Sequence, residues 1–169
     1  MTSLIDTHAH LCDPQFSEDR DQVLSRAAAQ GVQTLVEIAD SPQGWEAARA
    51  FSERNPGQGG PRVVWACGFH PHYAGEQEGF NFDIMVETAR LKGCVAVGEI
   101  GLDYVKSACS KEDQTALFRN ALEVAAELNK PVSIHCREAQ ADTLRILKSF
   151  FGGLGREDGR TGEIGRAHV

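Results

Sequence analysis

Residues 94 to 103 read Cys94-Val95-Ala96-Val97-Gly98-Glu99-Ile100-Gly101-Leu102-Asp103. The first seven are almost all small and apolar, which predicts a strand buried on both faces, as strands of parallel sheets are. Glu99 interrupts this pattern, because a carboxylate in such a strand is costly unless it is paired, hydrogen-bonded or bound to a metal. Gly98 and Gly101 have no side chain and predict a close approach of neighbouring backbone.

On both sides of this segment, short apolar runs alternate with longer stretches of helical period, which is typical of consecutive βα units. The predicted strands are residues 4–9, 34–38, 63–68, 94–100 and 132–135. The predicted helices are residues 17–30, with Ser17 as N-cap and Gly31 as stop, and then residues 44–54, 83–91, 111–129 and 139–150. Parallel βα units form either an open doubly wound sheet or a closed eight-stranded barrel.

Ionisable side chains lie at or just past the C-terminal ends of several predicted strands, namely His8, His70, Glu99 and His135. In a barrel these ends meet at one rim, so this distribution favours the barrel. A barrel of this kind usually needs about 250 residues. The chain has 169 residues and supplies about five of the eight units, so either the sheet is open or the chain is an incomplete barrel.

The composition is that of an ordinary globular protein, with 41% hydrophobic and 24% charged residues. A net charge of -7 and a pI near 5.3 exclude a global basic field that would attract nucleic acid or an anionic membrane. No apolar run approaches the roughly 20 residues of a membrane span, and the start lacks the layout of a secretory signal. Five scattered cysteines suit free thiols in a reducing compartment. We therefore expect a cytoplasmic protein with no membrane partner.

The first predicted strand ends in Asp6-Thr7-His8-Ala9-His10. Residues two apart in an extended segment point to the same face, so His8 and His10 can converge on one ion. Imidazole suits zinc, manganese, iron or nickel. Together with Glu99 and His135, the two histidines predict a metal site. The alternatives are surface or core histidines at 8 and 10, a core histidine at 135, and a buried arginine or lysine partner for Glu99.

Four further polar residues near the same strand ends are candidates for substrate binding. His70 and His72, in Gly68-Phe69-His70-Pro71-His72, can bind substrate or hydrogen-bond to metal ligands. Arg137 can bind a phosphate with both arms of its guanidinium. Asp103 either caps a helix or loop or contacts the site. Glu37 lies inside a predicted strand, where it can equally be an edge charge, and we assign it no role.

The sequence shows no serine nucleophile elbow, no phosphate-binding P-loop and no cysteine-centred arrangement, which leaves metal-assisted hydrolysis. Two divalent ions that share a carboxylate would lower the pKa of a bridging water and stabilise the leaving oxygen of an ester. We predict that Glu99 is this shared carboxylate and the catalytic residue.

Four segments together resemble the TatD family of metal-dependent hydrolases, and they cover the chain to about residue 150: Ile5–Leu11, Gly68–His72, Val97–Tyr104 and Pro131–Ala139. The resemblance implies an α/β fold, the (β/α)8 TIM barrel, of which about five βα units are present. It implies two divalent metal ions, of Mg, Mn or Zn, held by His8, His10, Glu99 and His135. It also implies a deoxyribonuclease or related phosphoesterase that acts on DNA ends, and we expect the full-length protein to be monomeric.

The family pattern includes a later histidine and a later aspartate, which the 169 residues lack. Residues 1–151 therefore read as the N-terminal part of one barrel domain, and the glycine-rich, charged residues 152–169 predict a disordered tail. Residues 164–169 are the peptide that ATC GGA AGA GCA CAC GTC would encode, a stretch that resembles a sequencing adapter, and we predict that they are not native. We expect a fragment of a competent hydrolase that is itself weakly active or inactive.

Two other functions stay open. The same metals would activate water for a small carboxylic ester, lactone or amide, as in other amidohydrolase-type barrels. The chain could also be a metal-binding fragment without catalysis. Assays on 3'-ended DNA and on small esters would distinguish the first alternative from a nuclease, and metal binding without any hydrolysis would indicate the second.

Overall fold

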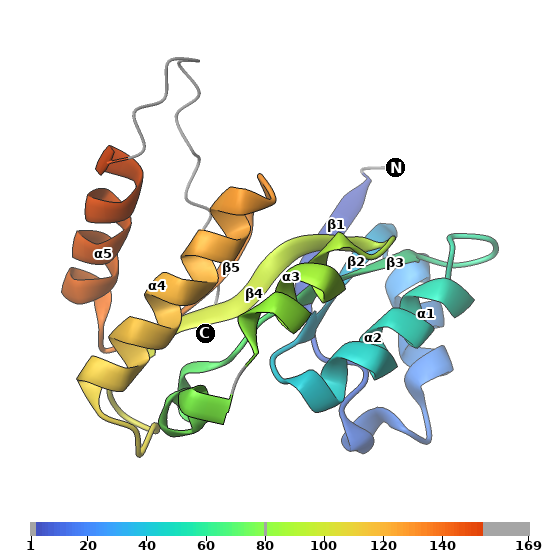
Figure 1. Ribbon diagram of the computed structural model, residues 1–169. Helices are drawn as coiled ribbons and strands as arrows, with labels where there is room; N and C mark the ends of the chain where they lie inside the picture. Colours follow the sequence, from blue (N-terminus) through green and yellow to red (C-terminus); the bar gives the residue numbers. More distant parts are fainter. Residues whose placement is uncertain (1–2, 80, 154–169) are drawn as a thin grey trace.

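A computed structural model describes residues 3–79 and 81–153 of the chain. Five parallel strands form one curled sheet, in which neighbours in the sequence are also neighbours in space (Figure 1). The strands are β1 (Leu4–Ala9), β2 (Val32–Ala39), β3 (Arg62–Cys67), β4 (Cys94–Asp103) and β5 (Val132–Arg137). A doubly wound sheet reverses its strand order, whereas a barrel adds each strand beside the previous one. The observed order therefore confirms the prediction of a partial α/β barrel.

Each strand is followed by a helix, as the βα pattern predicts: α1 (Arg20–Ala29), α2 (Pro42–Arg54), α3 (Phe82–Arg90), α4 (Lys111–Glu127) and α5 (Gln140–Gly153). The helices lie along the outer side of the curled sheet (Figure 1). Two short 3-10 helices, η1 (Pro14–Phe16) and η2 (Pro71–Gly79), follow β1 and β3. Within residues 3–79 and 81–153, no helix is both long and apolar enough to cross a membrane.

Local sequence signals account for several helix starts. The Asn81 side chain caps α3 by accepting a hydrogen bond from the backbone N–H of Asp83. The Ser110 hydroxyl caps α4 by accepting from the backbone N–H of Asp113. Pro42 occupies the first turn of α2, where a backbone N–H is not needed.

The start of α1 differs from the prediction, because this helix begins at Arg20 and not near residue 17. The 3-10 helix η1 takes up the preceding segment, and the Asp13 carboxylate caps it by accepting from the N–H of Gln15 at 2.8 Å. Ser17 therefore ends η1 and does not cap α1. The predicted stop at Gly31 is confirmed, since Gly31 has a φ of 92°, which glycine adopts without steric cost.

Four elements extend beyond their predicted C-terminal ends. β2 continues by one residue, to Ala39. β4 continues to Asp103 and β5 to Arg137, and these two residues are paired across the sheet. Both therefore lie in strands and not in loops. α5 continues to Gly153, beyond the predicted helix end at residue 150. The remaining residues of the predicted tail, 154–169, lie outside the described residues, and so do the predicted non-native residues 164–169.

The main hydrophobic core lies between β3, β4 and the helices that cover them, with the largest fully buried side chains at Trp65, Phe69, Phe118, Met85 and Ile100. β4 is buried from Val97 to Asp103, as predicted, although Val95 at its start is exposed. A second cluster packs beside β1 and β2 and contains Leu11, Leu24, Leu35, Phe51 and Val63. All five cysteines are free thiols, and two of them, Cys67 and Cys94, are buried.

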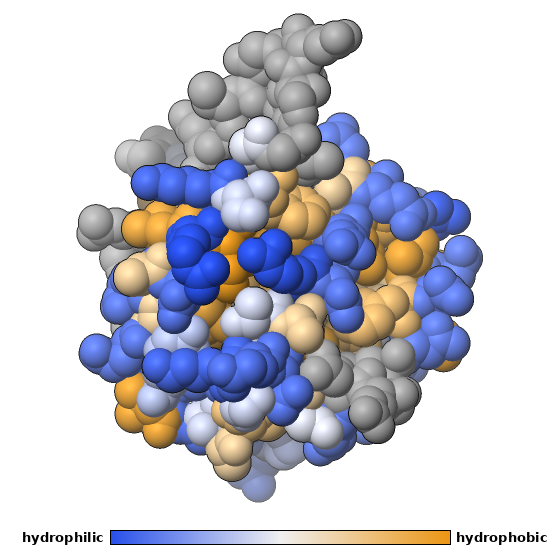
Figure 2. All heavy atoms as spheres, turned by 60° about the vertical axis from the view of Figure 1, so that its left-hand side comes forward, coloured by the Kyte–Doolittle hydropathy of each residue, from blue (hydrophilic) through white to orange (hydrophobic). Residues whose placement is uncertain are grey.

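The outer parts of the sheet are less covered than its middle. Ile5 on β1 is 63% exposed, and every residue of β5 is only partly buried. The face formed by α4 and α5 shows hydrophobic surface between hydrophilic side chains (Figure 2). Leu144 and Phe151 of α5 are exposed apolar residues.

Gly98 and Gly101 are the points at which β4 lies closest to β5. A Cβ atom on Gly98 would lie 2.6 Å from the Cβ of Ser133. Gly101 has a φ of 147°, and a Cβ atom there would overlap the carbonyl oxygen of His135. The predicted close approach is confirmed, and it brings the end of β5, with His135, beside Glu99.

Candidate metal centre

The C-terminal ends of the strands bring the predicted site residues together. His8 lies near the end of β1 and His10 directly follows it, Glu99 lies in β4, and His135 lies in β5. His70 follows β3, three residues after its end. Because the strands are parallel, all of these residues lie at one edge of the sheet, as the sequence predicts.

Glu99 is the centre of this arrangement, and only 8% of the residue is exposed. Its Oε2 atom lies 3.4 Å from His8 Nε2 and 4.0 Å from His10 Nε2. Its Oε1 atom lies 3.0 Å from His135 Nδ1. The partners of Glu99 are thus histidines, so the alternative of a buried arginine or lysine partner is wrong. Each oxygen of the carboxylate faces a different set of histidines.

The first set consists of His8 and His10, whose Nε2 atoms lie 3.2 Å apart. With Glu99 they form a group whose potential ligand atoms all lie within 4.8 Å of one another. The ring of His8 has a further contact through its other nitrogen, because its Nδ1 atom lies 3.3 Å from the Ser133 hydroxyl. Sequence reasoning did not single out Ser133, although the pattern of β5 places it two residues before His135.

The second set consists of His70, Glu99 and His135, and it meets the same 4.8 Å criterion. His70 Nε2 lies 3.2 Å from His135 Nδ1. The sequence indicated His70 only as a residue that binds substrate or supports a ligand. Its place within the second set follows from the sheet order, which puts the end of β3 beside β4.

Asp103 is a buried carboxylate, 1% exposed, that contacts a histidine of the second set. Its Oδ2 atom lies 3.0 Å from His135 Nε2 and 3.1 Å from His72 Nε2. Its Oδ1 atom accepts hydrogen bonds from the backbone N–H groups of Val105 and Lys106. Both functions left open by the sequence, a loop cap and a contact with the site, are therefore present in one carboxylate.

Gln114 of α4 was not identified from the sequence. Its Oε1 atom accepts the backbone N–H of Asp103 at 2.8 Å, and its Nε2 atom donates to the carbonyl of Cys109. A buried glutamine on the apolar side of a helix is the signal that could have indicated this contact. Arg137 is opposite Asp103 in the register of the sheet and is partly buried.

The electrostatics of the cluster follow from these contacts. Although burial would raise the pKa of Glu99, the hydrogen bonds from His135 and His8 hold it well below its usual range. Burial opposes the charged form of His135, but Glu99 and Asp103 raise its pKa overall. The hydrogen bond to Glu99 also raises the pKa of His8. Burial and the neighbouring His135 lower the pKa of His70 to about 4, so this ring is neutral at pH 7.

The donor set fits divalent cations. Two imidazole nitrogens lie 3.2 Å apart in the first set and two lie 3.2 Å apart in the second. The Glu99 carboxylate lies between the sets, with one oxygen toward each. Nitrogen and carboxylate oxygen are the ligands that zinc and related metals use in proteins. Asp103 contacts Nε2 of His135, in the way that carboxylates in metalloproteins orient a histidine through the nitrogen that does not bind the metal. These groups could therefore hold metal.

Comparison with known sequences identifies relatives that are described as nucleases or metal-dependent hydrolases. The family described as "TatD related DNase" matches residues 5–154. The chain is 34% identical over 149 residues to "3'-5' ssDNA/RNA exonuclease TatD" of Erwinia billingiae (strain Eb661), which covers 88% of this chain and 55% of the relative. It is 35% identical over 149 residues to "Uncharacterized metal-dependent hydrolase YcfH" of Escherichia coli (strain K12), with 86% and 53% covered. The chain thus spans about half the length of these curated relatives.

Solved structures share the fold. The crystal structure of YJJV, a TatD homolog from Escherichia coli K12, matches with a TM-score of 0.73 and 31% identity, over 87% of this chain and 56% of that chain. A hydrolase TatD family protein from Entamoeba histolytica matches in fold with a TM-score of 0.79 and 23% identity, over 89% and 55%. The family match covers most of the sequence and includes every residue of the candidate site, and on this ground the chain belongs to the family of TatD-related DNases.

Proposed function

We propose that this chain binds two divalent metal ions and that Glu99 is their shared ligand and the catalytic residue. The observation that carries the proposal is the division of the Glu99 carboxylate, with Oε2 beside His8 and His10 and Oε1 beside His135. His8, His10 and Glu99 would hold one ion. His135 and Glu99 would hold the other, with His70 near enough to contribute.

Such ions, when bound, supply Lewis acidity that lowers the pKa of water and stabilises a leaving oxygen. The residues of the chain prepare the ligands for them. We assign the Nε2 proton of His135 to its hydrogen bond with Asp103 and the Nδ1 proton to its hydrogen bond with Glu99, so that binding of an ion would displace the Nδ1 proton and free that lone pair. His70 is uncharged at neutral pH because burial lowers its pKa to about 4. His70 can therefore act as a ligand without first losing a proton, whereas His135 would release one when the ion binds.

To the whole protein we assign the hydrolysis of phosphodiester bonds at DNA ends. The name of the Erwinia billingiae relative, a 3'-5' exonuclease on single-stranded DNA and RNA, supports a nucleic-acid substrate. Arg137 and His72 at the edge of the cluster would contact phosphate. Because the net charge is -7, these residues and the bound ions would supply the local attraction for a polyanion. We place this activity in the cytoplasm and assign it to a monomer.

Metal binding is tested on the chain itself. After treatment with a chelator, the chain is expected to bind two Zn²⁺ or Mn²⁺ ions, counted by elemental analysis and isothermal titration calorimetry. Glu99→Gln is expected to weaken binding by at least about 100-fold, because it removes the shared charge. Glu53→Gln changes an exposed glutamate of α2 and should retain both ions. Fewer than two ions on the wild-type chain, or unchanged binding by Glu99→Gln, would contradict the proposal.

The reaction is tested on a chimera in which residues 1–151 replace the matching half of the Erwinia billingiae relative. With Mg²⁺, we expect it to shorten a 5'-labelled single-stranded oligonucleotide from its 3' end, resolved on a denaturing gel. The same chimera with Glu99→Gln should be inactive. A folded, metal-loaded chimera that leaves DNA intact but hydrolyses p-nitrophenyl acetate would replace the nuclease assignment with an esterase.

A further inference from the structure

Glu37 is a buried carboxylate that the proposed metal centre does not use. It lies in β2 and is 1% exposed. In the register of the sheet, Glu37 is paired with Ala9, the residue between His8 and His10. Its side chain reaches the segment that directly follows His10. Oε2 accepts the backbone N–H of Leu11, and Oε1 accepts that of Cys12, both at 2.8 Å.

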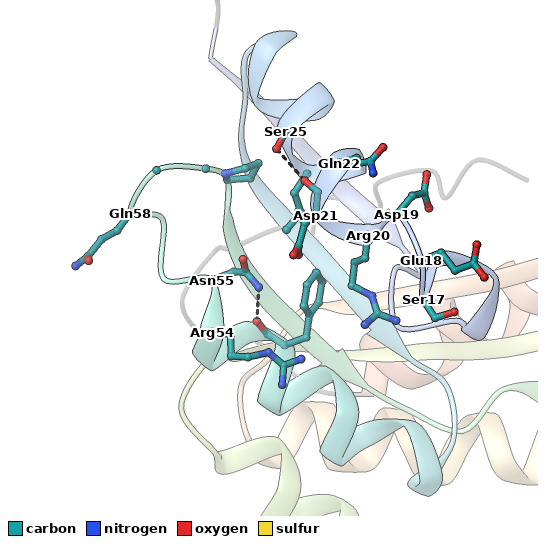
Figure 3. Close-up of a pocket in the computed structure, with 15 residues that line it drawn as sticks. Ser17, Glu18, Asp19, Arg20, Asp21, Gln22, Ser25, Arg54, Asn55 and Gln58 are labelled. Carbon is teal, nitrogen blue, oxygen red and sulfur yellow. Dashed lines mark hydrogen bonds between the residues drawn. The ribbon is translucent and has the colours of Figure 1, made fainter.

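The other side of the same segment is held by Arg20. Its Nε atom donates to the carbonyl oxygen of Leu11, so the two peptide groups of Leu11 are bound from two directions. Figure 3 shows that the Arg20 guanidinium points away from the carboxylate of its neighbour Asp19. The side chain of Leu11 is itself buried in the cluster beside β1 and β2. Residue 11 is thus fixed through its N–H, its carbonyl and its side chain.

His10 is the histidine that most needs such support. Its side chain is 42% exposed, compared with 25% for His8. The second ring nitrogen of His8 faces Ser133, and that of His135 faces Asp103. In the part of the chain that the structure describes, the His10 ring has His8 as its only side-chain hydrogen-bond partner. A ligating histidine usually has its other nitrogen held by a neighbour, which fixes the direction of the ring.

We propose that Glu37 is a positioning residue for His10: with Arg20 it immobilises the backbone that follows His10, and so directs this ring toward the ion shared with His8 and Glu99. The inference rests on the proposed metal centre. Glu37 does not touch the ion. It restricts the His10 ring through the backbone and not through a contact with the ring itself. The backbone on the C-terminal side of His10 can move only if both Glu37 hydrogen bonds break.

The test follows binding of Zn²⁺ alone to the full 169-residue chain, by calorimetry and by NMR of the histidine rings. Glu37→Gln keeps the size of the side chain but presents an amide N–H₂ to one of the two backbone donors. We expect it to weaken the ion that shifts the His8 and His10 signals by about 10- to 100-fold. The ion that shifts the His70 and His135 signals should keep its wild-type affinity. Glu37→Asp, which keeps two acceptor oxygens, should restore part of the loss.

Arg20→Gln is the second variant and breaks the other contact with Leu11, which keeps the test decisive if Glu37→Gln does not fold. It should weaken the same ion and spare the other. The matched controls are Glu53→Gln and Arg26→Gln, which change exposed residues of α2 and α1 and should bind both ions as the wild type does.

The outcomes separate the inference from the proposed function. If the wild-type chain binds no Zn²⁺ through His8 and His10, the metal centre itself fails. If the wild type binds both ions and the folded variants bind them unchanged, Glu37 has no positioning role. Equal weakening of both ions by Glu37→Gln would also overturn the inference, because it would indicate a general loss of structure.

Discussion

Glu37 and Glu99 form an informative pair, because each is a glutamate inside an apolar strand and each is followed by isoleucine. Both are buried, with 1% and 8% of the residue exposed. Their partners differ, since Glu37 accepts two backbone N–H groups whereas the oxygens of Glu99 face histidine rings. Burial raises the pKa of Glu37, but hydrogen bonds from His135 and His8 lower that of Glu99 in spite of burial.

This difference shows that burial of a carboxylate does not by itself indicate a metal ligand. Peptide N–H groups cannot be exchanged for a cation without breaking the local fold, so Glu37 supports structure. Imidazole nitrogens can exchange a proton for a metal ion, so the surroundings of Glu99 suit metal binding. The identity of the partners decides between the two functions, and the following measurements test that distinction.

The largest expected effect concerns stability without metal. Glu37→Ala leaves the N–H groups of Leu11 and Cys12 without an acceptor, at a cost of about 1–3 kcal/mol for each unsatisfied buried donor. At pH 9 in the presence of a chelator, Glu99→Ala should cost less, because the histidines around Glu99 carry less positive charge as the pH rises and then compensate its buried charge less. Urea denaturation followed by circular dichroism measures both. A larger loss for Glu99→Ala would contradict the distinction between the two glutamates.

The second effect concerns the support of His135. Asp103→Asn should weaken the ion at His135 by about 10- to 100-fold, because the asparagine no longer provides a charged acceptor for Nε2. Calorimetry with Zn²⁺ measures this change. Asp83→Asn, at an exposed position of α3, is the control. Wild-type affinity in Asp103→Asn would show that His135 needs no such support.

The third effect is the pH dependence of metal-free stability, which we expect to differ in sign for the two glutamates. The lowered pKa of Glu99 adds stability above its ordinary value of 4.5, which is lost as the pH falls through the folded value. The raised pKa values of His8 and His135 add stability below 6.5, which is lost as the pH rises through their folded values. The difference in unfolding free energy between wild type and Glu99→Gln should therefore be largest between pH 4.5 and 6.5.

For Glu37 the raised pKa means that the folded state favours the protonated form. Wild type should therefore lose stability relative to Glu37→Gln as the pH rises from 4.5 through the raised folded value. Urea denaturation at a series of pH values, with a chelator present, gives both profiles. Profiles of the same shape for the two variants would show that the partners do not set the two pKa values.

The smallest effect is expected at Ser133, whose hydroxyl lies 3.3 Å from His8 Nδ1. Ser133→Ala removes one neutral hydrogen bond, worth about 0.5–1.5 kcal/mol, so the affinity of the ion at His8 should fall a few-fold. Ser25→Ala on the exposed side of α1 is the control. A loss as large as that of Asp103→Asn would indicate that the hydroxyl, and not the Glu99 carboxylate, fixes the His8 ring.

Much of the fold could be predicted because βα units are local. β1 has its predicted bounds, and the other strands and helices are present with shifted ends. The predicted start of α1 was wrong because η1 occupies residues 14–16, and η1 depends on the Asp13 cap and not on helical period. The 3-10 helix η2 was not predicted, since the segment after His70 carries no apolar repeat.

The candidate site, like the fold, was predicted in part. His8, His10, Glu99 and His135 were predicted because ionisable residues at the ends of parallel strands converge on one edge. Their roles as ligands stay predictions. Three contacts escaped sequence reasoning because each joins two different segments of the chain that only packing brings together: Ser133 with His8, Gln114 with Asp103, and Glu37 with Leu11.

Local periodicity and side-chain size set the βα order, the close approach at Gly98 and Gly101 and the residue types at the strand ends, and all of these could be read from the amino acids alone. The folded chain was needed to learn which nitrogen faces which carboxylate oxygen, and that Glu37 binds backbone whereas Glu99 faces histidines. This is because a buried carboxylate takes its properties from its partners, and the sheet register and strand curvature bring those partners from other parts of the chain.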